Sequence, residues 1–369
     1  MRVLLITRHY PPAVSGGAKR PFLLAKELRK HGCDIFVVAP SLPQGENGVA
    51  EPHPHRDPST SGGGAQTFRD VAREFLLWPD PDIRWARRAA RTAFDQAPWR
   101  PDWIWTTSPP ESVHAAGVIL KRRYGAKWMA DFRDHWLDRP HRLEREALHR
   151  RVGERLIAQR WLVHADIVTC VDQFIADELR SLGPIDPQIT PHFSPSGLAT
   201  PIDLSAEYIN VVHTGAIALS DPHAQLEEML APFEQAVMQN PALRLHLVGR
   251  LSDREKSLVK ASPASRHVVL QDVQPLEVAL GFQQAADALI YVGSKKTHVP
   301  PSKITEYLAT DAPIIACGDG DWRQDERVGN QDPAAALAAL RHGDKRKLLI
   351  RAPSVADIAS KLLLKMQNT

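Results

Sequence analysis

Short runs of apolar residues alternate along the chain with stretches in which apolar residues recur at helical spacing. Residues 2–7 form the first run, a helical pattern follows from Lys19 to Lys30, and His31-Gly32 ends it before a second run at 34–39. This order predicts a parallel sheet with right-handed crossovers. The same patterns predict further strands at 103–106, 127–130, 166–170, 210–213, 244–248, 267–270, 288–291 and 313–316, and helices at 111–124, 142–163, 224–239 and 303–310.

A proline-rich stretch interrupts this alternation near the middle of the chain. It predicts a linker at 186–204 between an N-terminal domain, 1–185, and a C-terminal domain, 205–369. A chain of 369 residues is long enough for two hydrophobic cores. We therefore expect an α/β fold of two doubly wound, Rossmann-like domains that face each other across a cleft, with the ligand at the carboxyl ends of the strands.

The composition excludes several other classes of protein. Hydrophobic residues make up 43% of the chain and charged residues 24%, which is typical of folded globular proteins. Cys33, Cys170 and Cys317 lie far apart, so we expect neither disulfides nor a zinc site, and a reducing, cytoplasmic compartment. We find no apolar run of the length that a secretory signal or a membrane span needs. Residues 41–65 carry almost no large apolar side chains and are predicted to form a mobile surface loop.

Basic residues outnumber acidic ones in the first half of the chain, although the net charge is only +3. Residues 68–91 combine arginines with apolar side chains, a mixture that suits a helix on an anionic membrane. A helix packed on its own domain, with its arginines in water, explains the pattern equally well. The residues concerned are Arg69, Arg73, Phe75, Leu76, Leu77, Trp78, Arg84, Trp85, Arg87, Arg88 and Arg91.

Two stretches of the first half are candidates for ligand binding. Gly16 and Gly17 lie between the first strand and the first helix, where backbone N–H groups could hold a phosphate, or where the glycines simply form a tight turn. Arg133, Asp134 and His135 follow a predicted strand, and polar groups in that position are predicted to line an open cleft. Asp131, just before them, could instead cap a turn or form a salt bridge.

The second half contains a matching set of candidates. Ser302 is predicted to cap a helix whose first turn offers N–H groups, with the Lys303 ammonium, to an anion, while Glu306 could accept hydrogen bonds from ligand hydroxyls. A purely structural helix start would also use Ser302 and Glu306. Gly215 and Arg250 follow two predicted strands and, together with Lys303, could clamp a diphosphate.

These segments resemble a known family. The opening strand with YPPAVSGG, the segments TSPPESVH and ADFRDHW, and the later PSKITEYLATDAPII are similar in order and spacing to retaining glycosyltransferases of family 4, in particular to the subgroup that builds bacterial surface polysaccharides. The resemblance covers roughly residues 1–320 and implies the GT-B fold. It also implies an enzyme that moves a sugar from a nucleotide-diphosphate donor, most commonly a UDP-sugar, to a saccharide or lipid-linked saccharide with retention and without a metal or other cofactor.

The resemblance also implies roles for particular residues. Pro301, Ser302, Lys303 and Arg250 would lie near the diphosphate with Gly215, Gly16 and Gly17, and Glu306 would bind the ribose hydroxyls. Arg133, Asp134 and His135 would form the catalytic region. A lipid-linked acceptor would place the protein at the inner face of the cytoplasmic membrane, and no nucleic acid partner is expected.

The chain departs from the family pattern at two places. Many members have a glutamate where this chain has His298, and an Arg and a Lys just after the glycine that matches Gly215, where this chain has Ala216 and Ile217. A catalytically inactive relative that acts as a binding partner, and a UDP-sugar 2-epimerase of the same fold, are therefore alternatives to a transferase.

Overall fold

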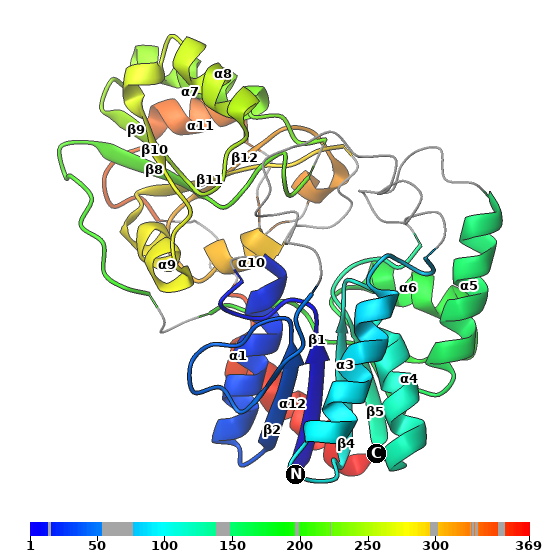
Figure 1. Cartoon of the computed structure of the whole chain (residues 1–369). Helices are drawn as coiled ribbons and strands as arrows, with labels where there is room; N and C mark the ends of the chain where they lie inside the picture. The colour runs from blue at the N-terminus through cyan, green and yellow to red at the C-terminus, as the bar shows by residue number, and fades with distance from the viewer. Residues whose placement is uncertain are drawn as a thin grey trace. The chain divides into compact units, whose positions relative to one another are not determined.

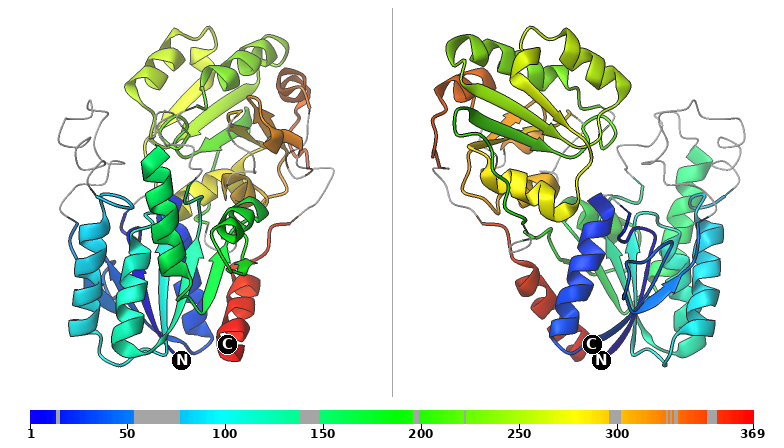
Figure 2. Two further views of the ribbon diagram at one scale, coloured as in Figure 1. Left: turned by 90° about the vertical axis from the view of Figure 1, so that its right-hand side faces the viewer. Right: turned by 60° about the vertical axis from the view of Figure 1, so that its left-hand side comes forward.

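The computed structural model divides the chain into two compact units. Unit 1 comprises Met1–His192 and Val355–Thr369, and unit 2 comprises Phe193–Ser354. Each unit contains one parallel sheet flanked by helices (Figures 1 and 2). The structure describes residues 1–13, 16–53, 77–137, 148–195, 199–221, 223–295, 302–324, 326, 328, 331–345 and 351–369.

Unit 1 contains a seven-stranded sheet in the order β3-β2-β1-β4-β5-β6-β7. The strand order reverses between β1 and β4, which is the position where doubly wound sheets bind ligands. Strands β1, β2, β4, β5 and β6 are largely buried because helices cover the sheet. Their bounds are β1 Arg2–Thr7, β2 Asp34–Ala39, β3 Gly48–Ala50, β4 Trp103–Ser108, β5 Lys127–Phe132, β6 Ile167–Cys170 and β7 Pro187–Ile189.

The helices of unit 1 pack in pairs on the sheet. Helix α3 packs against α4, and α1 packs against α12, the last helix of the chain (Figures 1 and 2). The core between α3, α4 and the sheet includes the buried side chains of Trp85 and Trp128. The helices are α1 Gly16–Lys30, α3 Ile83–Gln96, α4 Val113–Tyr124, α5 Leu148–Leu162, α6 Gln173–Ser181 and α12 Val355–Asn368.

Unit 2 repeats the design with a five-stranded sheet in the order β10-β9-β8-β11-β12. Here the order reverses between β8 and β11. The strands are β8 Ile209–Thr214, β9 Leu243–Val248, β10 Val268–Gln271, β11 Ala288–Val292 and β12 Ile314–Cys317. The helices are α7 Glu227–Gln239, α8 Asp253–Ala261, α9 Leu276–Ala285, α10 Ser302–Tyr307 and α11 Pro333–Ala339. The expected pair of doubly wound α/β domains is therefore confirmed.

The predicted strands all form, but two segments differ from the sequence-based prediction. Residues 48–50, within the predicted mobile loop, pair with β2 as β3, and the loop residues 54–65 lie outside the described residues. Residues 187–189 lie in the predicted linker but pair with β6 as β7. Both strands have three residues and lie at sheet edges, so neither leaves a recognisable apolar run. Of the predicted helix at 142–163, residues 148–162 are helical and 142–147 lie outside the described part.

The end of the chain differs from the expected division into domains. Residues 355–369 were expected in the C-terminal domain, but α12 buries Ile358, Leu362 and Met366 and packs in unit 1 against α1. The chain thus leaves unit 1 after His192 and returns at Val355. The two connecting segments pair with each other, because the Ser194 amide donates to the Pro353 carbonyl at 2.9 Å.

The described part of the arginine-rich segment forms helix α3, which packs on its own domain through Trp85. Trp85 is 1% exposed and its indole N–H donates to the Glu51 carbonyl at 2.8 Å. The arginines at 84, 87, 88 and 91 are exposed, which both interpretations of the segment expect. Residues 68–76 lie outside the described part. Within the described residues, no helix has both the length and the apolar character that a bilayer crossing needs.

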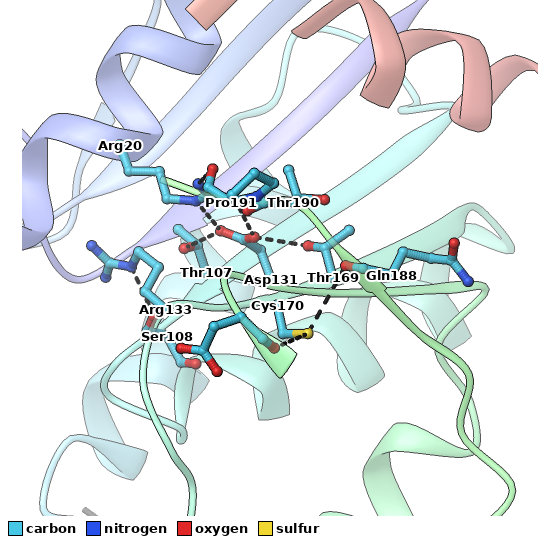
Figure 3. A network of polar contacts seen from close by, with 11 residues as sticks. Arg20, Thr107, Ser108, Asp131, Arg133, Thr169, Cys170, Gln188, Thr190 and Pro191 are labelled. Carbon is cyan, nitrogen blue, oxygen red and sulfur yellow. Dashed lines mark hydrogen bonds and ion pairs between the residues drawn. The ribbon is translucent and has the colours of Figure 1, made fainter. Parts of the chain in front are cut away.

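A buried carboxylate connects the strands of unit 1 at their carboxyl ends (Figure 3). Asp131, at the end of β5, is 2% exposed and accepts hydrogen bonds from the Thr107 hydroxyl on β4 (2.9 Å) and the Thr169 hydroxyl on β6 (2.8 Å). Two nitrogens of the Arg20 guanidinium on α1 donate to it, each at 3.3 Å. Asp131 is therefore a salt-bridging residue, one of the two structural roles that the sequence allowed.

The same guanidinium reaches the end of β7. Arg20 donates to the backbone carbonyls of Thr190 (2.8 Å) and Pro191 (2.9 Å) (Figure 3). Burial alone would raise the pKa of Asp131, but the charge and hydrogen bonds of Arg20 and the two threonine hydroxyls lower it below its usual value. Asp131 is thus ionised, and its charge is matched by Arg20 inside the protein.

We predict that Leu362→Ala destabilises unit 1 and not unit 2. Leu362 is 5% exposed on α12, and a cavity of this kind typically costs about 2–5 kcal/mol. Hydrogen exchange of the α1 amides should accelerate, while exchange in β8 and β9 should not change. Leu364→Ala, at a position 60% exposed on the same helix, is the matched control. Faster exchange confined to unit 2 would contradict the assignment of α12.

We predict that Arg20→Met lowers the free energy of unfolding by about 3–5 kcal/mol at neutral pH, because it leaves the Asp131 carboxylate buried without its cation. Urea titration followed by circular dichroism measures the loss, and Lys26→Met, at an exposed site of α1, is the control. Since the pKa of Asp131 is lowered by folding, its stabilisation is present above the unfolded-state pKa of about 3.9 and is lost as the pH falls through the folded value. Without Arg20, burial raises the pKa of Asp131 in the folded variant, so the difference from wild type should narrow as the pH falls from neutral through the acid range. A constant difference would show that Asp131 is not ionised.

Candidate functional site

Arg133 joins the two candidate stretches of unit 1. It follows β5, and its guanidinium donates to the carbonyls of Ser108 (2.7 Å), Pro109 (3.1 Å) and Gly17. A Cβ atom on Gly17 would lie 2.9 Å from the same guanidinium, which explains why glycine suits this position. Gly17 and Arg133, which come from two separate candidate stretches, therefore lie in contact with each other in unit 1.

Burial also changes the acidity of this guanidinium. It lowers the pKa of Arg133 to about 10, with Asp131 opposing the shift and Arg20 adding to it. Arg133 therefore keeps its charge at neutral pH, and its donors are directed to three main-chain carbonyls. The arrangement fixes the backbone between the end of β4 and the start of α1.

His135 lies in a turn that a glutamate from another helix holds. One oxygen of Glu178, on α6, accepts from the main-chain amides of Trp136 (2.8 Å) and Leu137 (2.9 Å). Its other oxygen lies 2.8 Å from Nδ1 of His135. Asp134 accepts from the His135 amide at 2.9 Å. Sequence reasoning missed Glu178, because a glutamate in the middle of an amphipathic helix gives no local signal of what it contacts.

The His135–Glu178 pair shifts both acidities. Burial alone would lower the pKa of His135, but the hydrogen bond and the charge of Glu178, and then the charges of Asp134 and Asp172, raise it. Burial alone would raise the pKa of Glu178, but the hydrogen bonds from His135 and the two amides lower it. The pair therefore favours an ionised Glu178 beside a His135 ring whose Nδ1 carries a proton.

In unit 2, Lys303, Gly215 and Gly249 lie close together at the ends of β8 and β9. The Lys303 ammonium donates to the Thr214 carbonyl and lies directly over Gly215, where a Cβ atom would be 2.2 Å away. Gly215 has a φ of +96°. A Cβ atom on Gly249 would lie 2.7 Å from the Gly215 carbonyl group. Two glycine turns and one cation thus pack so closely that side chains at these positions would displace them.

A buried polar shell holds Thr214 and so the turn at Gly215. The Thr214 amide donates to the Tyr307 hydroxyl at 3.1 Å, and the Gln283 amide donates to the Thr214 hydroxyl at 2.8 Å. Burial, with the charge of Lys303, lowers the pKa of His213 to about 3, so its ring is neutral. Since Nδ1 of His213 lies 3.0 Å from the Ile290 carbonyl, the proton is on Nδ1. Tyr307 and Gln283 were not predicted, because both lie at buried helical positions.

The positions of the other predicted site residues do not show what each of them binds. Gly16 begins α1 with open space around it, and Ser302 is exposed and begins α10 itself rather than preceding it as the predicted cap. Arg250 follows Gly249 and is half-buried, as is Glu306 on α10. Pro301 and His298 lie outside the described residues. In the described part of the chain, no three His, Cys, Asp or Glu side chains are grouped as metal ligands.

Comparisons with known proteins agree with this architecture. Residues 15–191 match the model of a glycosyl transferase 4-like domain. No curated protein sequence matches the chain. Similar solved structures include a putative UDP-N-acetylglucosamine 2-epimerase from Listeria monocytogenes (12% identity, TM-score 0.59, covering 100% of this chain and 96% of that one). Another is AviGT4, a glycosyltransferase involved in avilamycin A biosynthesis (13% identity, TM-score 0.55, covering 100% of this chain and 97% of that one). A third is MnaA of S. aureus with UDP (11% identity, TM-score 0.51, covering 98% of this chain and 94% of that one).

At these identities the solved structures define the fold, while the domain match concerns the first half of the chain. The two Rossmann-like sheets of seven and five parallel strands are those of the GT-B architecture. The chain therefore has the GT-B fold, and its residues 15–191 match a glycosyl transferase 4-like domain.

Proposed function

We propose that the protein is a glycosyltransferase that moves a sugar, with retention at the anomeric carbon and without a metal ion, from a nucleotide-diphosphate donor to a saccharide or lipid-linked saccharide in polysaccharide or glycoconjugate synthesis. The observation that carries the proposal is the position of Lys303 over Gly215 and beside Gly249, in a chain whose residues 15–191 match a glycosyl transferase 4-like domain. Glycine turns at strand ends let main-chain groups approach a phosphate, and the ammonium supplies the charge.

In this proposal the diphosphate lies at the ends of β8 and β9. Lys303 and Arg250 bind its oxygens together with the amides at the start of α10, and Glu306 binds the ribose hydroxyls. UDP is the proposed nucleotide, which is consistent with the UDP in the structure of S. aureus MnaA, a protein of similar fold. Fixed donors of this kind stabilise the negative charge that develops on a departing nucleoside diphosphate.

The proposed transfer breaks the bond between the anomeric carbon and the donor phosphate and forms a bond from that carbon to an acceptor hydroxyl oxygen. The acceptor's proton passes to the departing phosphate, so the balance needs no protein base and no further reactant. Unit 1 supplies the region around Arg133, Asp134 and His135, which positions the sugar. Rigid placement of reacting groups is the protein's main contribution to such a step.

One experiment distinguishes the transferase from two alternatives, an epimerase and an inactive binding partner. An epimerase is favoured by the similar Listeria structure, and an inactive binding partner by the uncharged residues Ala216 and Ile217 after Gly215. The domain match of residues 15–191 favours the transferase. Incubation with UDP-N-acetylglucosamine, with and without a saccharide acceptor and with a chelator present, distinguishes them. A transferase gives a glycosylated acceptor, an epimerase a changed sugar without acceptor, and an inactive partner neither.

We predict that Lys303→Met weakens UDP binding about 10- to 100-fold, the loss expected when charge-assisted hydrogen bonds of about 1.5–3 kcal/mol are removed. Thermal shift in a UDP titration measures this, because UDP at 100 times its dissociation constant adds about 2.7 kcal/mol to the stability of the protein. Lys295→Met, at an exposed lysine that pairs with Asp319, is the matched control. Equal UDP affinity in both variants would rule out this diphosphate site.

A lipid-linked acceptor would bring unit 1 to the cytoplasmic face of a membrane, and the exposed arginines of α3 fit an anionic lipid surface. Arg88 already pairs with Glu51 at 2.8 Å, so Arg87 and Arg91 are the better probes. We predict that Arg87→Glu combined with Arg91→Glu reduces co-sedimentation with vesicles that contain phosphatidylserine and leaves UDP binding unchanged. Unchanged co-sedimentation would exclude this surface.

A further inference from the structure

Both carboxylate oxygens of Glu178 contact the turn formed by residues Arg133–Leu137. Its side chain is 6% exposed, and both of its oxygens bind this one turn: the amides of Trp136 and Leu137 on one oxygen, and Nδ1 of His135 on the other. The carboxylate thus fixes both the main chain of the turn and the plane of the histidine ring. The His135 side chain keeps 23% of its surface exposed, so part of the ring is accessible to a ligand.

The charges around His135 indicate what kind of ligand it takes. Glu178 on α6, Asp134 beside it in the turn and Asp172 at the start of α6 all act on the ring, and all three are acidic. Three carboxylates disfavour a phosphate at this position. They favour a ring that is protonated on both nitrogens, which donates a hydrogen bond from Nε2 to a neutral oxygen.

From these contacts we propose that Glu178 is a positioning residue: it holds the 133–137 turn and orients His135 to donate a hydrogen bond to a sugar hydroxyl of the substrate. This proposal rests on the proposed function, because the substrate is the sugar of a glycosyl transfer. The ligand of His135 is then a sugar oxygen and not a diphosphate. The sugar is that of the donor or that of the acceptor, which offer the same hydroxyl chemistry.

The direct test is the titration of His135 by NMR in wild type and in Glu178→Gln. The glutamine keeps an oxygen for the two main-chain amides but removes the charge, so the turn is retained. The His135 pKa should fall in the variant, and the resonance is assigned by its loss in His135→Gln. Asp177→Asn, at the neighbouring exposed carboxylate of α6, should leave the titration unchanged. An unchanged titration in Glu178→Gln would overturn the proposal.

Kinetics test the role in the reaction. A ring that acts while protonated loses activity as the pH rises through its pKa, so kcat/KM should fall at lower pH in Glu178→Gln than in wild type. At neutral pH we expect a loss of about 10- to 100-fold, the range known for carboxylates that orient a metal-bound histidine. A loss that is equal at every pH would indicate a purely structural role and would overturn the proposal.

Coupling and ligand affinity complete the test. Combined with His135→Gln, Glu178→Gln should cause little further loss, because both changes remove the same hydrogen bond. If the donor sugar is bound, Glu178→Gln weakens UDP-sugar and not UDP; if the acceptor is bound, its KM rises instead. Unchanged affinity for both sugars would overturn the proposal. A wild-type protein without transferase activity would refute the proposed function, whereas the titration would still report whether Glu178 controls His135.

Discussion

A buried negative charge that must be neutralised inside the protein determines how unit 1 is organised. Asp131 is ionised at the end of β5, and its four hydrogen bonds come from α1, β4 and β6. An uncompensated carboxylate at this depth would cost several kcal/mol, so the helix and both neighbouring strands are held in register around it. Arg20 extends the network to the main chain after β7 (Figure 3). The turn that carries Arg133, Asp134 and His135 starts two residues after this fixed point.

The two units differ in the groups that form hydrogen bonds and ion pairs with the polar side chains at their strand ends. In unit 1, ion pairs satisfy polar groups at the strand ends, and Glu178 fixes the turn that follows. In unit 2, neutral groups do so: Tyr307 and Gln283 hold Thr214, and His213 is kept uncharged beside Lys303. The Lys303 ammonium there donates to the Thr214 carbonyl and lies over Gly215. At His135 in unit 1, by contrast, the neighbouring charges that raise the pKa of the ring are acidic.

The sequence predicts the central strands well because each is a continuous apolar run bounded by turn residues. It does not predict β3 or β7, whose three residues have too few side chains for a pattern, nor that α12 packs in unit 1, since an amphipathic pattern does not say which core it covers. The closeness of Gly215 to Lys303 could be predicted from their positions at a strand end and a helix start. The contacts of Glu178 and Tyr307 could not, because a polar side chain inside a helix gives no local signal of the group that it meets.

The return of the chain to unit 1 has a consequence for its synthesis. Because Val355–Thr369 follows unit 2 in the chain, α1 has no α12 to cover it while unit 2 is made. Domains usually fold in the order in which they emerge, but here the first unit is completed last. A nascent chain that stops anywhere before residue 355 therefore exposes apolar surface on α1, and this surface would identify it to chaperones as unfinished.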